Sequence, residues 1–100
     1  MRKNKDGIHI YDMVAHEGIK KACEIASKTL DMIGNYVEPG VTTEELDKTC
    51  HDFILAHNSV PATLGYRGYP KSCCISLNHV VCHGIPSNKR LKNGDILNID

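Results

Sequence analysis

The amino-acid sequence predicts an α+β fold, with helices packed on one face of an antiparallel sheet. In the first part of the chain, apolar residues recur every three or four positions, which is typical of amphipathic helices. In the last part, short apolar runs alternate with turn residues, as strands do. Because the helices precede the strands instead of alternating with them, an antiparallel sheet is favoured. The chain has 100 residues, enough for one small domain.

The first helix is predicted from about residue 14 to residue 36. Residues 1–12 show no clean periodicity, and we expect a frayed or extended start there. The helix should end before Pro39-Gly40, which is a turn signal. Its apolar stripe consists of Ile19, Ala22, Ala26, Leu30, Ile33 and Val37.

A second helix is predicted to begin at Thr42, which can cap it together with Glu45 in a capping box. The helix should end near residues 58–59, because Pro61 follows. Its buried stripe is expected to contain Leu46, Cys50, Phe53 and His57.

The remaining sequence predicts a shaped loop and then strands. Residues 63–70 are rich in glycine and aromatic residues, which is typical of a loop that approaches a ligand closely. Residues 73–77 and 80–83 are predicted to form two strands joined tightly at Asn78. Residues 95–100 predict a further strand. A domain seldom ends in an apolar strand, so we expect an incomplete domain over residues 13–100, truncated after Asp100.

Composition excludes several classes of protein. Twelve basic and twelve acidic residues give a formal net charge of zero, so nothing predicts a specific nucleic acid or membrane partner. No apolar run approaches the roughly 20 residues of a membrane span. The basic start lacks a secretory core, which predicts a cytoplasmic protein with reduced thiols. The cysteines are Cys23, Cys50, Cys73, Cys74 and Cys82.

Three kinds of chemistry compete between residues 73 and 100. A zinc site is one, but its adjacent ligands would point to opposite faces of a strand. A cysteine nucleophile with a histidine base, such as Cys74 with His83, is a second. A hydrolase site in which His83 and an inward-pointing Asp100 work with a metal is the third. The zinc ligands would be Cys73, Cys74, His79, Cys82 and His83.

Three segments of the sequence form recognisable motifs: residues 37–47 (Val-Glu-Pro-Gly-Val-Thr-Thr-Glu-Glu-Leu-Asp), residues 64–78 around Gly-Tyr-Arg-Gly-Tyr-Pro-Lys-Ser, and residues 82–100 from Cys-His-Gly-Ile-Pro to Asn-Ile-Asp. In this order and in one register, they resemble the type I methionine aminopeptidases. The resemblance implies the N-terminal half of a pita-bread fold. It also implies removal of the initiator methionine from nascent proteins. Two alternatives stay open: a non-catalytic binding protein of the same fold, and another metallo-aminopeptidase such as a proline-directed one.

The resemblance also implies roles for individual residues. His83 is expected to be the catalytic histidine, which also contacts substrate, and Asp100 the first of five ligands of the divalent metals. Asn78 and Val80 match positions that hold a monovalent cation in some relatives. The positions that match the methionine side-chain pocket are Thr63, Tyr66, Tyr69 and Cys74.

The family's cofactors and partners are implied in the same way. The full-length enzymes use two divalent ions (Co, Mn, Fe or Zn), which this chain cannot hold with Asp100 alone. Their substrate is the N-terminal methionine of nascent polypeptides at the ribosome exit region, and they are usually monomeric. We therefore expect the 100-residue chain to be inactive by itself.

Overall fold

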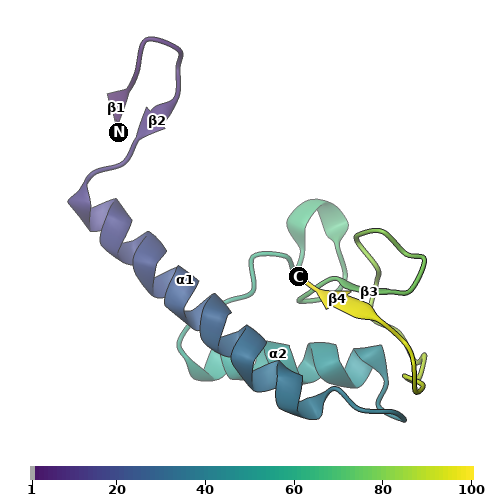
Figure 1. The fold of residues 1–100 in the computed structure, drawn as a ribbon. Helices are drawn as coiled ribbons and strands as arrows, with labels where there is room; N and C mark the ends of the chain where they lie inside the picture. The colour runs from purple at the N-terminus through teal and green to yellow at the C-terminus, as the bar shows by residue number, and fades with distance from the viewer. Residues whose placement is uncertain (1) are drawn as a thin grey trace.

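The computed structural model describes residues 2–100 and has two long helices beside a small sheet (Figure 1). Helix α1 (Met13–Ile33) continues into the short helix η1 (Gly34–Tyr36), and α2 (Thr43–Ala56) runs across it. A further short helix, η2 (Tyr66–Gly68), lies in the loop that follows. The strands are β1 (Arg2–Lys3), β2 (His9–Ile10), β3 (Ile75–Leu77) and β4 (Leu97–Ile99). Helices therefore precede the main sheet, as predicted.

The core forms where the C-terminal end of α1, helix α2 and strand β3 meet. Leu46 and Cys50 are the most completely buried side chains and come from one face of α2. The predicted stripe on this helix is therefore confirmed at these two positions, while His57 at its end is exposed. The buried cluster consists of Ile33, Leu46, Cys50, Cys73, Ile75, Leu77 and Leu91.

The start of α2 has the capping box that the sequence predicts. The Thr42 hydroxyl accepts from the backbone N–H of Glu45 (3.0 Å), and the Glu45 carboxylate accepts from the backbone N–H of Thr42 (2.9 Å). The capping box thus satisfies two otherwise unpaired donors at the start of the helix. The helix ends at Ala56, and Asn58 then adopts a left-handed φ of 56°.

The predicted stripe on α1 is wrong over most of its length. Ile19 and Leu30 are about half exposed, and the N-terminal part of α1 extends away from the rest of the molecule (Figure 1). Ile33 is buried as the stripe predicts, and Thr29, which the stripe did not include, is the other buried residue of the helix. Thr29 is compatible with burial because its hydroxyl donates to the carbonyl of Ile25 (2.7 Å). Only the last turns of α1 face α2 and the sheet.

The predicted hairpin between residues 73–77 and 80–83 is wrong. Strand β3 pairs with β4 in antiparallel register, with Ile75 opposite Ile99 and Leu77 opposite Leu97. Residues 80–83 form no strand, because Asn78 and His83 both have left-handed backbone angles, which interrupt an extended run. The predicted strand at residues 95–100 is confirmed at Leu97–Ile99.

Residues 2–10 form a two-stranded hairpin, where the sequence predicted a frayed or extended start. Arg2 pairs with Ile10 and Lys3 with His9. Asn4 closes the turn, since its side-chain oxygen accepts from the N–H groups of Asp6 and Ile8 (both 2.9 Å). The hairpin projects from the end of α1 (Figure 1). None of the helices within residues 2–100 combines the length and apolar character needed to cross a membrane.

Backbone and side-chain hydrogen bonds join the loop after His83 to the start of α2, although the two segments are distant in sequence. The N–H of Leu91 donates to the carbonyl of Val41, and the N–H of Gly40 donates to the carbonyl of Leu91 (both 2.8 Å). The Thr43 hydroxyl accepts from the N–H of Ser87 (2.8 Å), and the N–H of Glu44 donates to the Ser87 carbonyl (2.9 Å). These bonds anchor one end of the loop that carries His83.

Candidate functional site

A hollow of about 320 Å³ gathers most of the residues that the sequence marks as functional. We call it the site hollow. Asp100 directly follows β4, Cys74 directly precedes β3, and His83 lies in the loop after β3. Its lining residues are Ala62, Thr63, Tyr66, Cys74, His83 and Asp100. Five of the eight predicted site residues therefore lie together, although they come from four separate places in the sequence.

Asp100 lies opposite Cys74 across the ladder. The N–H of Cys74 donates to the carbonyl of Asp100 (2.8 Å), and the N–H of Asp100 donates to the carbonyl of Cys74 (2.9 Å). The two side chains of such a pair leave the sheet on the same side. Asp100 is exposed, so the prediction of a buried inward carboxylate is wrong, because Asp100 lies at the rim of the hollow.

The backbone around His83 is held against β3. His83 has a φ of 55°, a left-handed conformation that non-glycine residues rarely adopt. The next residue, Gly84, accepts from the N–H of Ile75 (2.8 Å) and donates to the hydroxyl of Ser76 (3.0 Å). A Cβ on Gly84 would overlap the Ile75 carbonyl oxygen. The loop therefore fixes the backbone of His83 and leaves its exposed ring at the hollow.

Tyr69 does not line the site hollow. Its hydroxyl donates to the carbonyl of Cys73 (3.0 Å) and lies 3.3 Å from the carbonyl of Gly84. Burial, followed by the hydrogen bond to Cys74, raises the pKa of the Tyr69 phenol. A phenol that stays protonated can serve as a donor to both carbonyls. In this structure Tyr69 bridges β3 and the His83 loop.

Asn78 and Val80 lie in a different hollow, of about 260 Å³. The Asn78 side chain is engaged there, because its amide oxygen accepts from the N–H of Ile96 and its amide nitrogen donates to Asp95 (both 3.1 Å). This hydrogen bond from Asn78 is the main cause that lowers the pKa of Asp95. The two predicted cation positions are thus close to each other and separate from the site hollow.

Asp100 is the carboxylate that lines the site hollow. Within residues 2–100, no three His, Cys, Asp or Glu side chains lie close enough together to hold a metal ion, so the zinc site considered above does not form. Cys74 and His83 both line the site hollow, but no hydrogen bond joins them in the described part of the chain. The carboxylate of Asp100 has no hydrogen-bond or ion-pair partner among these residues. It fits a divalent ion as one oxygen ligand.

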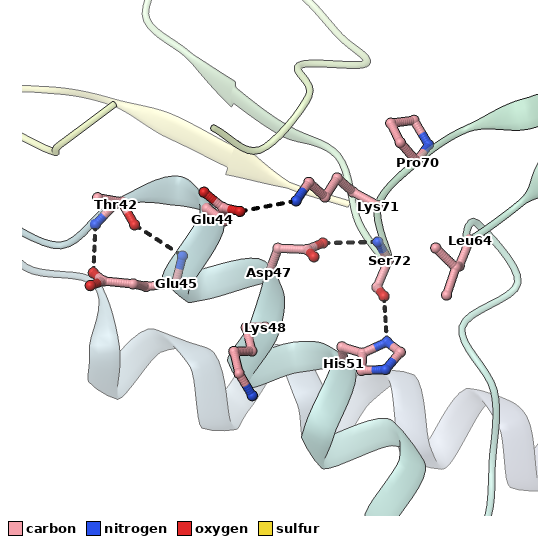
Figure 2. A pocket seen from close by; sticks show the side chains of 10 residues that line it. All are labelled: Thr42, Glu44, Glu45, Asp47, Lys48, His51, Leu64, Pro70, Lys71 and Ser72. Carbon is pink, nitrogen blue, oxygen red and sulfur yellow. Dashed lines mark hydrogen bonds and ion pairs between the residues drawn. The ribbon is translucent and has the colours of Figure 1, made fainter. Parts of the chain in front are cut away.

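A polar cluster of Asp47, His51 and Ser72 was not predicted from the sequence. Asp47 accepts from the N–H of Ser72 (2.9 Å), and His51 Nδ1 lies 2.7 Å from the Ser72 hydroxyl. Figure 2 shows both side chains reaching from α2 toward Ser72, in a groove of about 530 Å³. His51 is half-buried and is held by this contact. The available signal was the spacing of Asp47 and His51, four residues apart on one helix face.

The sequence and the fold match one group of known proteins. Residues 17–100 match the metallopeptidase family M24. A methionine aminopeptidase of Rickettsia prowazekii is 57% identical over 82 residues, which are 82% of this chain and 32% of that protein. Methionine aminopeptidase 1b of Plasmodium falciparum is 48% identical over 98 residues, 98% of this chain and 19% of that protein. The chain thus spans a third or less of these relatives.

Solved structures agree with the sequence matches. The crystal structure of the Rickettsia prowazekii methionine aminopeptidase superposes with a TM-score of 0.82 at 52% identity, covering 92% of this chain and 37% of that one. That of the Thermotoga maritima methionine aminopeptidase gives a TM-score of 0.88 at 29% identity, covering 91% and 37%. Both proteins share the arrangement of helices and strands described above over nearly the whole of this chain.

Proposed function

The chain belongs to the metallopeptidase family M24, and from this premise we propose that it forms the N-terminal part of an enzyme that removes the initiator methionine from new proteins. Its predicted fold, the first half of a pita-bread fold, is confirmed by the structural matches. The observation that carries the functional proposal is the site hollow. It puts an exposed imidazole, a carboxylate and a thiol around one space.

Asp100 is proposed as one ligand of the divalent ions. Its carboxylate is exposed at the hollow, and carboxylate oxygens suit hard divalent cations. When bound, the ions supply Lewis-acid chemistry, which polarises the scissile carbonyl and lowers the pKa of a bound water. The other ligands come from outside residues 2–100. The choice among Co, Mn, Fe and Zn depends on the complete set of ligands in the whole protein.

His83 is proposed to donate a hydrogen bond to the substrate as charge develops on its carbonyl oxygen. The support is geometric: its backbone is fixed through Gly84, while its ring is exposed at the hollow. A donor held in place before reaction needs no reorganisation when charge appears. His83 would then act on the substrate and not as a metal ligand.

The methionine side chain is proposed to lie against Tyr66, Cys74 and Thr63. All three line the site hollow, and a thioether packs well against aromatic rings and sulfur. The substrate class is therefore the N-terminal methionine of a peptide, met by the whole protein in the cytoplasm as nascent chains leave the ribosome.

Asn78 and Val80 are proposed to hold a monovalent cation through main-chain carbonyl oxygens. The Asn78 amide oxygen already accepts from Ile96, which leaves the main-chain carbonyl for an ion. Both residues line the same small hollow beside the turn after β3.

Replacement of His83 tests the function directly. The assay uses these 100 residues joined to the C-terminal two thirds of the Rickettsia prowazekii relative, with a Met-Ala peptide as substrate. His83→Ala should lower kcat by roughly a hundredfold or more, since losing one such donor costs about 2.7–4 kcal/mol. Metal content, measured on the same preparation, should stay unchanged. His79→Ala is the matched control, because His79 is exposed outside the hollow and its loss should leave kcat unaltered.

Other results would point elsewhere. Loss of metal together with activity in His83→Ala would make His83 a ligand. Full activity of that variant would remove His83 from the reaction. Cleavage of Xaa-Pro peptides with none of Met-Ala would identify a proline-directed aminopeptidase, and no cleavage of any peptide by the metal-loaded fusion would identify a non-catalytic binding protein.

A further inference from the structure

A buried carboxylate touches the backbone just before Cys74. Asp47 on α2 is 7% exposed, and its Oδ1 atom accepts three hydrogen bonds. The donors are the N–H of Ser72 (2.9 Å), the N–H of Cys73 (2.9 Å) and the Cys73 thiol (3.2 Å). Figure 2 shows the Asp47 side chain directed at Ser72. Within residues 2–100, no lysine, arginine or histidine forms an ion pair with it.

The three donors explain how the buried charge is tolerated and why it holds the backbone of Ser72 and Cys73 in place. Burying a carboxylate without a cation carries a large desolvation penalty, which well-directed N–H groups offset. A displaced backbone at Ser72 and Cys73 would leave that charge without donors. Hydrogen bonding to Cys50, burial and Asp47 itself raise the pKa of Cys73, so its thiol stays protonated and can donate. Asp47 therefore stabilises one placement of this backbone over its alternatives.

That placement determines which way Cys74 faces. Cys74 follows directly and exchanges two backbone hydrogen bonds with Asp100 (2.8 and 2.9 Å). A slip of one residue would turn its side chain to the other side of the strand and away from the hollow. His51, one turn after Asp47, holds the same segment through the Ser72 hydroxyl (2.7 Å).

We propose that Asp47 is a positioning residue for the candidate site, which holds Ser72 and Cys73 so that Cys74 faces the hollow opposite Asp100. The inference rests on the proposed function only for what the hollow binds. Asp47 itself does not line the hollow, so it acts through Cys74 and touches no substrate. Its removal should therefore weaken binding of the methionine side chain.

Hydrogen exchange on the 100-residue chain tests the placement without any assay of activity. In Asp47→Asn, the amides of Ser72, Cys73 and Asp100 should exchange at least about tenfold faster, because charged acceptors bind donors more strongly than neutral ones. Cys74 should also react faster with a thiol reagent, as read by peptide mass spectrometry. Asp52→Asn is the matched control, since Asp52 lies on the same helix and forms an ion pair with the exposed Lys48.

The pattern of exchange separates positioning from general stability. Unchanged exchange at these amides would overturn the proposal, and so would equal acceleration of every buried amide in α1 and α2. If Asp47→Asn does not fold, Asp47→Glu keeps the charge but moves it by one methylene. Acceleration confined to the same amides in that variant supports the proposal, and wild-type exchange there overturns it.

Kinetics of the fusion protein give the second readout. Asp47→Asn should raise KM for the Met-Ala peptide by about tenfold with kcat within about threefold, as lost binding of a side chain does. Added to Cys74→Ala, it should raise KM no further, because both changes remove the same contact. Additive effects would mean that Asp47 does not act through Cys74. An inactive unsubstituted fusion would instead refute the proposed function, while the exchange result would stand alone.

Discussion

Gly84 is the described glycine with the least space for a Cβ atom. A Cβ there would lie 2.8 Å from the Ile75 carbonyl carbon and 2.9 Å from the Ser76 Cα, which are backbone atoms that cannot move aside alone. We expect Gly84→Ala to destabilise the chain by about 1–3 kcal/mol, as overpacking does, measured by denaturant unfolding. Gly18→Ala is the control, because its Cβ meets nothing within 4 Å in the middle of α1 and should stabilise the helix slightly. Equal stability of the two variants would contradict the close contact.

Tyr66 and Tyr69 should respond differently to substitution, although the sequence suggested one role for both. Tyr66 is 64% exposed at the hollow, so Tyr66→Ala should raise KM in the fusion protein and leave stability unchanged. Tyr69→Phe removes only the hydroxyl that bridges Cys73 and Gly84, and should cost about 0.5–1.5 kcal/mol of unfolding free energy. Thermal unfolding and steady-state kinetics on each variant separate the two effects. A raised KM in Tyr69→Phe at unchanged stability would restore Tyr69 to the pocket.

Single residues differed in how far the sequence could predict them. His83 and Asp100 were identified because they stand in motifs whose residues are adjacent in sequence. Asp47 was missed, because its three donors lie 25 and 26 positions away, and the spacing of Asp47 and His51 indicates a shared helix face but not the segment that this face binds. Asp100 was expected to be buried, since alternation along a strand gives the face but not the depth at which the strand ends.

At the scale of elements, the capping box makes α2 the helix with the clearest local signal. Thr42→Ala removes the acceptor for the Glu45 N–H and should cost about 1 kcal/mol. For a chain of this size that corresponds to a drop of roughly 4–8 °C in Tm, measured by circular dichroism. Thr49→Ala is the control within α2, because its hydroxyl donates to the Glu45 carbonyl of the preceding turn and caps no helix end. A Tm unchanged by Thr42→Ala would show that the cap contributes nothing.

Helices were easier to predict than strand partners. The observed ends of α1 and α2 agree with the predicted ends to within a few residues, because caps and turn residues act locally. Val80 and Val81 favour a strand by composition, yet Val81 is 92% exposed and lies outside the strands that the structure describes. Strand β3 instead pairs with β4, some 20 residues later, and buries Ile75 and Leu77 in doing so. Pairing was decided by which residues reach the core, a non-local property that composition does not contain.

At the scale of the whole molecule, the 100 residues should bind peptide poorly and release no methionine by themselves. They provide one candidate ligand for divalent metal, Asp100, and no group of three ligands within residues 2–100. We therefore expect no product from a Met-Ala peptide with manganese or cobalt added to the pure, folded chain. The fusion protein in the same assay is the positive control. Methionine release that co-purifies with the chain and disappears in Asp100→Asn would contradict this expectation.

The pairing of Cys74 with Asp100 also sets an order of events during synthesis. Helices α1 and α2 are made of local contacts, so they can form as soon as their residues leave the ribosome. The site hollow cannot, because Asp100 must meet Cys74, and Ser87 must meet Thr43 across 44 positions of chain. Until Asp100 has emerged, β3 lacks its partner strand and its edge is open to other chains. A nascent chain from which residue 77 but not yet residue 97 has left the ribosome would therefore carry formed helices and an aggregation-prone strand.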